Sequence, residues 1–437
     1  MLGGMTAPSD VRIIALGPEH RGEVIRVDQA AFAFPMTEVD PELDTEHFEW
    51  DRTYAAVRPA PATRVRPAEA TWSEDEDLAG VMTSYSLSLA VPGFDADVRA
   101  TPVAGLSWVS VHPDHRRRGV LTAMMRHHLH GLHDDGAEAI SGLFASEPNI
   151  YRRFGYGESA PGLAFTLARG TALQPSTGAA DVTTQLVPAA TDGIPALVDD
   201  VFSRAELLRP GRMSRPMVAT RSLLRDRPER HPGVELNQVV VVRRDGRPSG
   251  YALFRRKADW RNGTPDGKVE VIELVGLDAA SLHALWSRVL DLDLMSEITT
   301  PILGFDDPLV VWLVDARSSG HRTDALWLRL VDVDRALTAR GYAHDVDVVF
   351  DLADDMCPWN SGRWHLAVSA DSVTCERTAD DAALSLDTRE LATAYLGGPS
   401  LMSLAAAGLV TEREAGAVAA LSTALRGTVE PAVPPMF

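Results

Sequence analysis

The chain has 437 residues, of which 45% are apolar and 24% charged, an ordinary composition for a soluble protein with two or three domains. Its 42 Lys and Arg against 61 Asp and Glu give a formal net charge of −19. This charge argues against nucleic acid or an anionic membrane as a partner and favours cationic substrates. The two cysteines, Cys357 and Cys375, are too few for a disulfide scaffold or a cysteine-ligated zinc site. Because no secretory leader or membrane-length apolar run is recognisable, a cytoplasmic protein is expected.

A helix is predicted from Pro18 through Ala31, and the most informative stretch lies further along the chain, at residues 106–132. Apolar residues up to Val111 predict a buried strand, and apolar residues at helical spacing from Val120 predict a helix. Between them stand three arginines and a glycine, at residues 116–119. Free N–H groups and the dipole of a helix N-terminus favour an anion, so this turn is predicted to bind a pyrophosphate. The chain has neither a Walker loop nor a dinucleotide fingerprint at this place.

A second motif follows about 25 residues later. It reads Ala-Ser-Glu-x-x-Ile-Tyr-x-Arg-Phe-Gly-Tyr-Gly from Ala145 to Gly157. The two motifs together resemble the GNAT N-acetyltransferases. The strand followed by Arg-x-x-Gly is similar to the acetyl-coenzyme A loop of that family, and Tyr-x-x-x-Gly-Tyr is similar to its catalytic tyrosine segment. The first motif departs from the usual family pattern at Leu121, where glycine or alanine is typical.

The two motifs, with Cys-Pro-Trp-Asn-Ser-Gly-Arg-Trp at residues 357–364 and Tyr-Leu-Gly-Gly at residues 395–398, resemble the actinobacterial enhanced intracellular survival (Eis) acetyltransferases. The resemblance covers nearly the whole chain. It implies a mixed α/β (α+β) architecture with two tandem GNAT folds, the second degenerate, followed by a sterol-carrier-protein-like domain. It also implies a homohexamer.

The domains are predicted at residues 1–169 (catalytic, binding acetyl-CoA), 170–320 (degenerate) and 321–437 (sterol-carrier-like, with a catalytic C-terminus). In the second, a helix near Pro195 and a hairpin across residues 244–247 repeat the first plan. After its strand at residues 269–275 there is no arginine, and Asp278 would repel a phosphate.

The resemblance also assigns the site residues. Tyr151 is expected to protonate the departing thiolate, since a tyrosine pKa of about 10 keeps it protonated at neutral pH. The free carboxylate of Phe437 is expected to act as the base. The predicted coenzyme-binding residues are Val109, Ser110, Val111, Arg117, Arg118, Gly119, Val120, Leu121, Thr122, Ser146 and Glu147.

The predicted reaction is acetyl transfer from acetyl-CoA to a primary amine of a small cationic molecule of the aminoglycoside type. Two alternatives remain open: a protein-lysine acetyltransferase, and a lipid or sterol carrier based on the third domain. No metal is predicted, and His127 and His130 are interpreted as members of a solvated or interface helix face.

Overall fold

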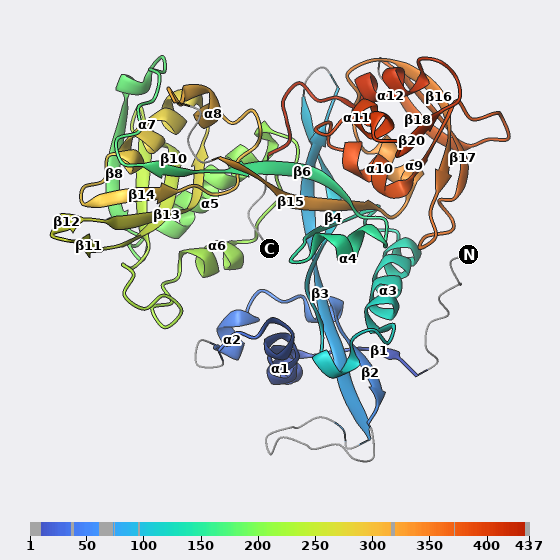
Figure 1. Cartoon of the computed structure of the whole chain (residues 1–437), viewed down its shortest axis with the longest axis horizontal. Coiled ribbons are helices and arrows are strands. Elements are labelled where there is room, and N and C mark those ends of the chain that lie inside the picture. Colours follow the sequence, from blue (N-terminus) through green and yellow to red (C-terminus); the bar gives the residue numbers. More distant parts are fainter. Residues whose placement is uncertain are drawn as a thin grey trace.

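The structure, a computed structural model, describes residues 10–35, 39–60, 73, 75–94, 97–315, 320–370 and 372–432. These residues form three larger β-sheets with helices packed on them, together with a two-stranded hairpin of β11 (Trp260–Arg261) and β12 (Thr264–Pro265) (Figure 1). The mixed α/β class is therefore confirmed. In the described part of the chain no helix combines the length and the apolarity that a membrane crossing demands.

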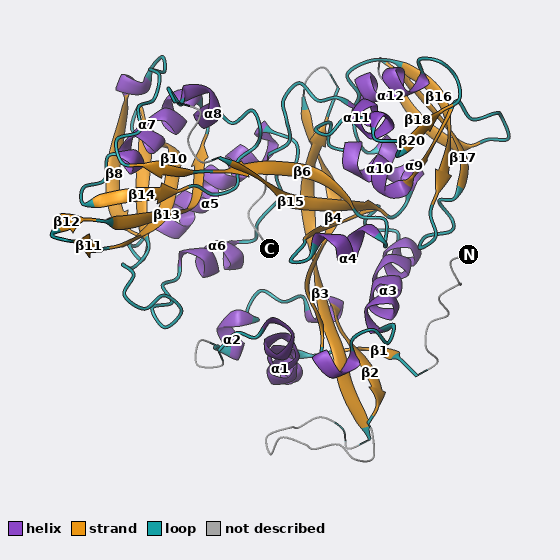
Figure 2. Cartoon of the chain, in the orientation of Figure 1, coloured by secondary structure: helices purple, strands orange, loops and turns teal. Residues whose placement is uncertain are grey.

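The first sheet has the strand order β1-β2-β3-β4-β5-β15-β6, and of its neighbouring pairs the β4–β5 pair is parallel. Its strands are β1 (Arg12–Ala15), β2 (Thr53–Pro59), β3 (Glu76–Pro92), β4 (Val98–Val111), β5 (Ile140–Phe144), β15 (His321–Leu330) and β6 (Gly157–Ala164). Helices α1 (Arg21–Phe32) and α2 (Pro41–Asp44) lie on one side of the long β3–β4 ribbon, and α3 (Val120–Asp135) and α4 (Pro148–Arg152) lie on the other (Figure 2). The expected strand, turn and helix at residues 106–132 are thus present as β4, the turn and α3.

Strand β15 differs from the predicted domain division. Residues 321–330 were expected to open the third domain, yet β15 lies between β5 and β6 of the first sheet. Its apolar side chains are buried, so the first sheet would lose an interior strand if the chain were divided at residue 320. Sequence periodicity could not reveal this, because the residues of the second sheet lie between β5 and β15 in the sequence. The first, second and third units are the three larger sheets, each with the helices packed on it.

The second sheet has the order β7-β14-β13-β10-β9-β8. The expected hairpin is present as β9 and β10, and the expected helix near Pro195 as α5. The elements are β7 (Thr166–Ala168), β8 (Val182–Pro188), α5 (Ile194–Ala205), α6 (Met217–Leu224), β9 (Gln238–Arg244), β10 (Arg247–Lys257), β13 (Gly267–Gly276), α7 (Ala279–Leu290), β14 (Met295–Thr299) and α8 (Pro308–Trp312).

The third sheet has the order β18-β17-β16-β19-β20. Its elements are α9 (Val333–Thr338), β16 (Val346–Ala353), β17 (Gly362–Ser369), β18 (Ser372–Arg377), β19 (Leu384–Asp387), α10 (Thr388–Ala394), α11 (Leu401–Ala406), β20 (Val410–Glu412) and α12 (Ala417–Leu425). Its apolar core is continuous with that of the first sheet, because Leu326 and Leu328 of β15 belong to the same buried cluster as Phe350 and Leu391. The two sheets therefore share one hydrophobic interior.

Candidate active site

The first sheet opens at the end of β4. Strands β4 and β5 pair at Ala104–Ser141 and Gly105–Gly142, and their pairing ends there. Three residues later the β3–β4 register shifts between Val81 and Thr83, and Trp108 adopts a φ of 54°. A bulge of this kind bends a strand and leaves backbone groups unpaired, so the end of β4 can offer its backbone to a ligand.

A cavity of about 660 Å³ occupies this opening. Its walls contain every predicted coenzyme residue except Arg118, together with Tyr151. The lining residues are Ala31, Phe32, Val109, Ser110, Val111, His115, Arg116, Arg117, Gly119, Val120, Leu121, Thr122, Ser146, Glu147, Ile150, Tyr151 and Arg153. The hydroxyl proton of Ser110 is already used, since it donates a hydrogen bond to the buried Asp28 carboxylate on α1.

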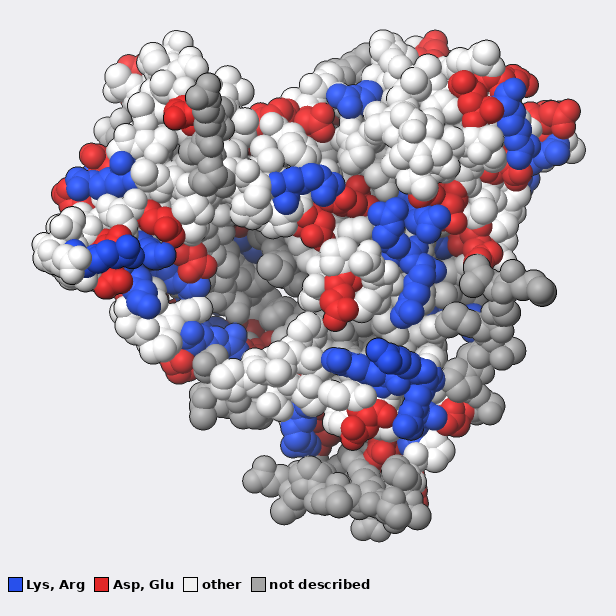
Figure 3. Space-filling model, in the orientation of Figure 1, with Lys and Arg blue, Asp and Glu red and all other residues white. Residues whose placement is uncertain are grey.

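One end of the cavity is the N-terminus of α3. Gly119 occupies the N-cap with a φ of 76° and makes no side-chain cap, so the first-turn N–H groups lack a partner within the helix. Arg116, Arg117 and Arg153 add positive charge to the same walls. Figure 3 shows basic side chains gathered where α3 begins in Figure 1. Backbone donors, a helix dipole and three guanidinium groups together have the chemistry that a pyrophosphate requires, so this end of the cavity is a candidate anion site.

The three consecutive arginines are not equivalent. Arg116 lies in the cavity wall, where its guanidinium donates to the carbonyl of Ala31 at 3.2 Å. Arg118 is exposed outside the lining, and its charge lowers the pKa of Asp10 after the larger effect of Arg58. The structure thus places Arg116 and Arg117 at the cavity, where the sequence pointed to Arg117 and Arg118.

Tyr151 stands in the opposite wall, on the short helix α4. Gly155 ends this segment with a φ of 82°, a conformation that favours glycine. Tyr156 then packs edge-on against Tyr151, with ring centroids 5.9 Å apart, and its hydroxyl bonds the Ser141 hydroxyl at 2.8 Å. Burial, and secondarily the Glu147 carboxylate, raise the pKa of Tyr151 to about 12, so its hydroxyl is protonated over the physiological range.

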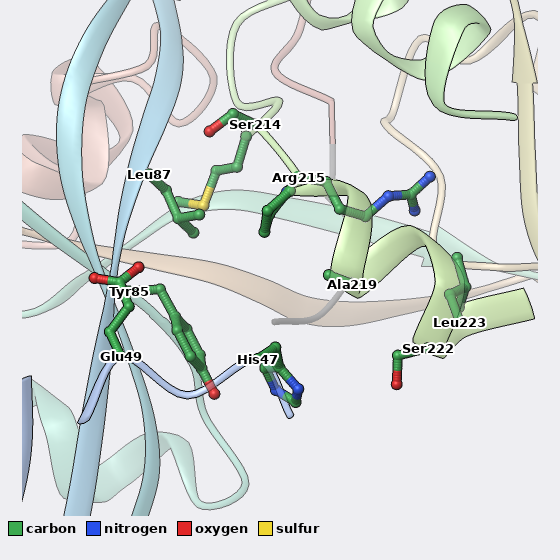
Figure 4. Close-up of a pocket in the computed structure, with 11 residues that line it drawn as sticks. His47, Glu49, Tyr85, Leu87, Ser214, Arg215, Ala219, Ser222 and Leu223 are labelled. Carbon is green, nitrogen blue, oxygen red and sulfur yellow. The ribbon is translucent and has the colours of Figure 1, made fainter. Parts of the chain in front are cut away.

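A second, smaller cavity of about 260 Å³ lies on the other face of the first sheet, where α6 approaches β3 (Figure 4). It is lined by His47, Glu49, Tyr85, Leu87, Met213, Ser214, Arg215, Pro216, Ala219, Ser222 and Leu223. A Cβ on Gly142 would lie 2.9 Å from Met213, which places this cavity next to the point where β4 and β5 separate. Sequence reasoning missed these residues, because the walls come from two units and carry no contiguous motif.

The predicted base, Phe437, lies outside the described residues, but the chain leading to it is held firmly. The backbone N–H of Glu430 donates to Asp306 at 3.0 Å, and its carbonyl accepts from Arg209 at 2.9 Å. The N–H of Ala432 donates to the carbonyl of Pro210 at 2.8 Å. Residues 430–432 therefore cross from the third unit to the segment that continues into Met213 of the smaller cavity.

The corresponding place in the second unit is closed. After β13, Asp278 caps α7 by accepting the N–H of Ser281 at 2.8 Å, and its other oxygen pairs with Arg244 at 3.3 Å. The helix terminus that has no side-chain cap in the first unit is capped here by the chain's own carboxylate. The sequence predicted a degenerate second acetyltransferase fold, and this capped helix terminus is the structural basis of that prediction.

The histidines of α3 have other partners. The ring of His127 packs edge-on against Tyr54 at 4.6 Å, and His130 bonds the carbonyl of Met356 at 3.1 Å. Among the described residues no group of three or more His, Cys, Asp or Glu side chains is arranged to hold a metal ion.

Comparison with known proteins accounts for this architecture. Residues 12–159 and 211–340 match models described as acetyltransferase (GNAT) domains, and residues 333–434 match one described as a sterol carrier protein domain. The fold and site therefore define a GNAT acetyltransferase with a sterol-carrier-type third unit.

The chain is 39% identical over 409 residues to an uncharacterized N-acetyltransferase of Streptomyces coelicolor, covering 89% of this chain and 97% of that protein. It is 32% identical over 363 residues to the N-acetyltransferase Eis of Mycobacterium tuberculosis, covering 81% and 84%. The crystal structure of Eis1 from Mycobacterium abscessus superposes with a TM-score of 0.76 at 29% identity, covering 97% of this chain and 99% of that one. The chain belongs to the Eis family of N-acetyltransferases.

Proposed function

We propose that the protein transfers the acetyl group of acetyl-CoA to the primary amine of a small cationic molecule. The observation that carries the proposal is that one cavity joins an uncapped helix N-terminus flanked by arginines to a protonated tyrosine. The first element suits the pyrophosphate of the coenzyme and the second suits the thiolate that leaves.

The amine nitrogen attacks the thioester carbonyl carbon, an N–C bond forms and the C–S bond breaks. Tyr151 gives its hydroxyl proton to the departing sulfur. Its raised pKa makes the hydroxyl a weaker acid, but the same burial raises the pKa of the leaving thiol and keeps the two groups comparable. The unpaired backbone at the β4 bulge is suited to orient the pantetheine arm and the carbonyl.

We assign the proton that the amine loses to the carboxylate of Phe437. A carboxyl group of pKa about 3.5 is a weak base for an alkylammonium of pKa about 10.4, so a desolvated site is needed to bring the two values together. Support comes from the anchoring of residues 430–432 beside the segment that lines the smaller cavity. Phe437 lies five residues after Ala432, a reach of at most about 17 Å.

Thiol release from acetyl-CoA, measured against aminoglycosides, arylalkylamines and lysine peptides, tests the proposal. Turnover with one or more small amines, dependent on Tyr151, supports it. Turnover confined to peptides favours the protein-lysine alternative. An absence of turnover together with saturable uptake of a lipid into the third unit favours the carrier alternative.

The assembly is part of the same proposal. By family membership we infer a homohexamer in solution, and sedimentation of the purified protein tests it.

A further inference from the structure

Three buried polar side chains form a hydrogen-bonded row behind the tyrosine segment. Nε2 of His128 on α3 lies 2.9 Å from the hydroxyl of Ser141 on β5, and that hydroxyl lies 2.8 Å from the hydroxyl of Tyr156. All three residues are buried. The ring of Tyr156 in turn packs edge-on against the ring of Tyr151. This buried polar network of His128, Ser141 and Tyr156 therefore ends beside the proposed proton donor.

The network occupies positions where the local patterns favour apolar side chains. His128 follows Met124 by four residues and Met125 by three, so it lies on the buried face of α3. Ser141 lies on the same face of β5 as Leu143, which shares one apolar cluster with the two methionines. Buried polar groups cost free energy unless they are hydrogen-bonded, so each member of the network depends on the next.

An arrangement of protons exists that satisfies the whole network. Burial, and secondarily the charge of Arg52, lower the pKa of His128 to about 3, so its ring is neutral. Burial also raises the pKa of Tyr156, which keeps its hydroxyl proton. Tyr156 can then donate to Ser141 and Ser141 to Nε2 of His128, because a neutral imidazole has one acceptor nitrogen. The network is thus complete without any charge, and it can fix a position.

The position of Tyr151 depends on its packing partners. Its helix, α4, is five residues long, and so short a helix is not stable by itself. The hydroxyl of Tyr151 makes no hydrogen bond with another described residue. The side chain packs on the buried cluster that contains Phe154 and Tyr156. A shift of the Tyr156 ring would therefore move Tyr151.

The other end of the network lies on the helix that begins at the candidate anion site. His128 is eight residues beyond Val120, the first residue of α3, which is about two turns. Ser141 pairs with Ala104 where β4 and β5 are still joined, next to the opening that holds the cavity. One set of hydrogen bonds thus connects the helix of the anion site, the edge of the opening and the tyrosine segment.

We propose that this buried polar network positions the hydroxyl of Tyr151 for proton transfer to the coenzyme sulfur, which makes its three members positioning residues. The inference rests on the proposed acetyl transfer and adds residues to its machinery. None of the three lines the coenzyme cavity, so their effect passes through Tyr151.

The test uses Tyr156→Phe, which removes one hydroxyl and keeps the ring, and His128→Leu, which removes the other end of the network. We expect each to lower kcat by about tenfold or more and to leave the acetyl-CoA dissociation constant unchanged, because a misplaced acid affects the chemical step. In the double variant kcat should fall no further than in the slower single variant, since both changes break one network. His128→Gln should recover most of the lost kcat, because its amide oxygen can accept from Ser141.

The matched control is Tyr395→Phe, which removes a buried hydroxyl that donates to the carbonyl of Ala336 at 2.9 Å in the third unit. Urea unfolding should show similar losses of stability in Tyr395→Phe and Tyr156→Phe, whereas kcat should fall only in Tyr156→Phe. This comparison of two tyrosine variants decides the question even if His128→Leu does not fold.

Three results would overturn the inference while acetyl transfer stands: a wild-type kcat in Tyr156→Phe, an equal loss of kcat in the two tyrosine variants, or losses that multiply in the double variant. No thiol release by the wild-type enzyme with any amine would instead overturn the proposed function, and the inference with it.

Discussion

Arg329 and Asp354 form a bidentate ion pair, with oxygens 2.6 and 2.7 Å from one guanidinium nitrogen and side chains 0% and 1% exposed. Arg329 belongs to β15 of the first sheet, and Asp354 follows β16 of the third. The same aspartate also accepts the N–H of Cys357 and the amide of Asn360. The segment Cys-Pro-Trp-Asn, noticed in the sequence as part of a family resemblance, is thus the third unit's side of a buried polar junction.

Asp354→Ala should be strongly destabilising, because it leaves the Arg329 guanidinium buried and uncompensated. Breaking a buried pair in this way costs about 3–5 kcal/mol, whereas an exposed pair contributes at most about 1 kcal/mol. The control is Glu297→Gln, which removes a pair with Lys268 whose side chains are 36% and 58% exposed. Urea unfolding measures both variants. If both variants lose the same free energy of unfolding, the buried ion pair contributes no more to stability than the exposed one.

Gly155 connects this junction to Tyr151, the proposed proton donor. A Cβ at Gly155 would lie 2.8 Å from the guanidinium of Arg329 and 2.7 Å from Thr388. Gly155→Ala therefore should add a steric clash to the ~1 kcal/mol of left-handed backbone strain, and should lower kcat by displacing α4. Gly170→Ala is the control, because Gly170 has a φ of 71° and nothing within 4 Å of its Cβ. If kcat falls equally in both variants, the contacts of Gly155 with Arg329 and Thr388 do not position Tyr151.

The sequence revealed local features and missed those that depend on distant segments. The turn at residues 116–119 and the tyrosine motif are contiguous, so strand, helix and anion site followed from residue spacing alone. The place of β15 did not, because strand partners across the second unit leave no local periodicity. The smaller cavity was missed for the same reason, since His47 and Met213 meet only after the units fold together. The sequence also did not show that Arg116, rather than Arg118, lines the cavity. Arg117 between them has a positive φ, and residue spacing does not reveal such a turn in the backbone.

The arginines of the turn should differ in their effect on coenzyme binding. Arg116→Ala and Arg117→Ala each remove a charged group from the cavity wall, and a charge-assisted contact is worth about 1.5–3 kcal/mol. We expect the dissociation constant of acetyl-CoA to rise by about tenfold or more in each. Arg118→Ala should raise it less, since Arg118 lies outside the cavity lining. Calorimetry measures the acetyl-CoA dissociation constants of the three variants. If Arg118→Ala gives the largest increase, the pyrophosphate binds along a different path.

Tyr151→Phe should keep the ring packing against Tyr156 and lower kcat by about 10²–10⁴, the usual contribution of a positioned acid. The hydroxyl is a donor only below its pKa, and burial raises this pKa to about 12, so the donor form persists as the pH rises. The wild-type rate should accordingly show no decline near pH 10, where an unperturbed tyrosine would ionise. The pH dependence of kcat measured to pH 10.5 checks this. If the wild-type rate instead declines near pH 10, and this decline is absent from Tyr151→Phe, then Tyr151 has the pKa of an ordinary tyrosine.

Residues 430–432 of the C-terminal segment are anchored to the second unit. Asp306 holds both Arg209 and the backbone of Glu430, so Asp306→Ala should loosen residues 430–432, which keep the hydrogen bond from Ala432 to Pro210. If the terminal carboxylate is the base, a loosened tail lowers kcat by about 10–100-fold through lost positioning and leaves the acetyl-CoA dissociation constant unchanged. Asp293→Ala is the control, because Asp293 pairs with Arg169 on the surface of the same unit and has no hydrogen bond or ion pair with residues 430–432 in the described part of the chain. Appending three residues after Phe437 should reproduce the loss of turnover with Asp306 intact. Full turnover in the extended enzyme would assign the base to another group, and Glu147 and Glu49 are the carboxylates among the described lining residues of the two cavities.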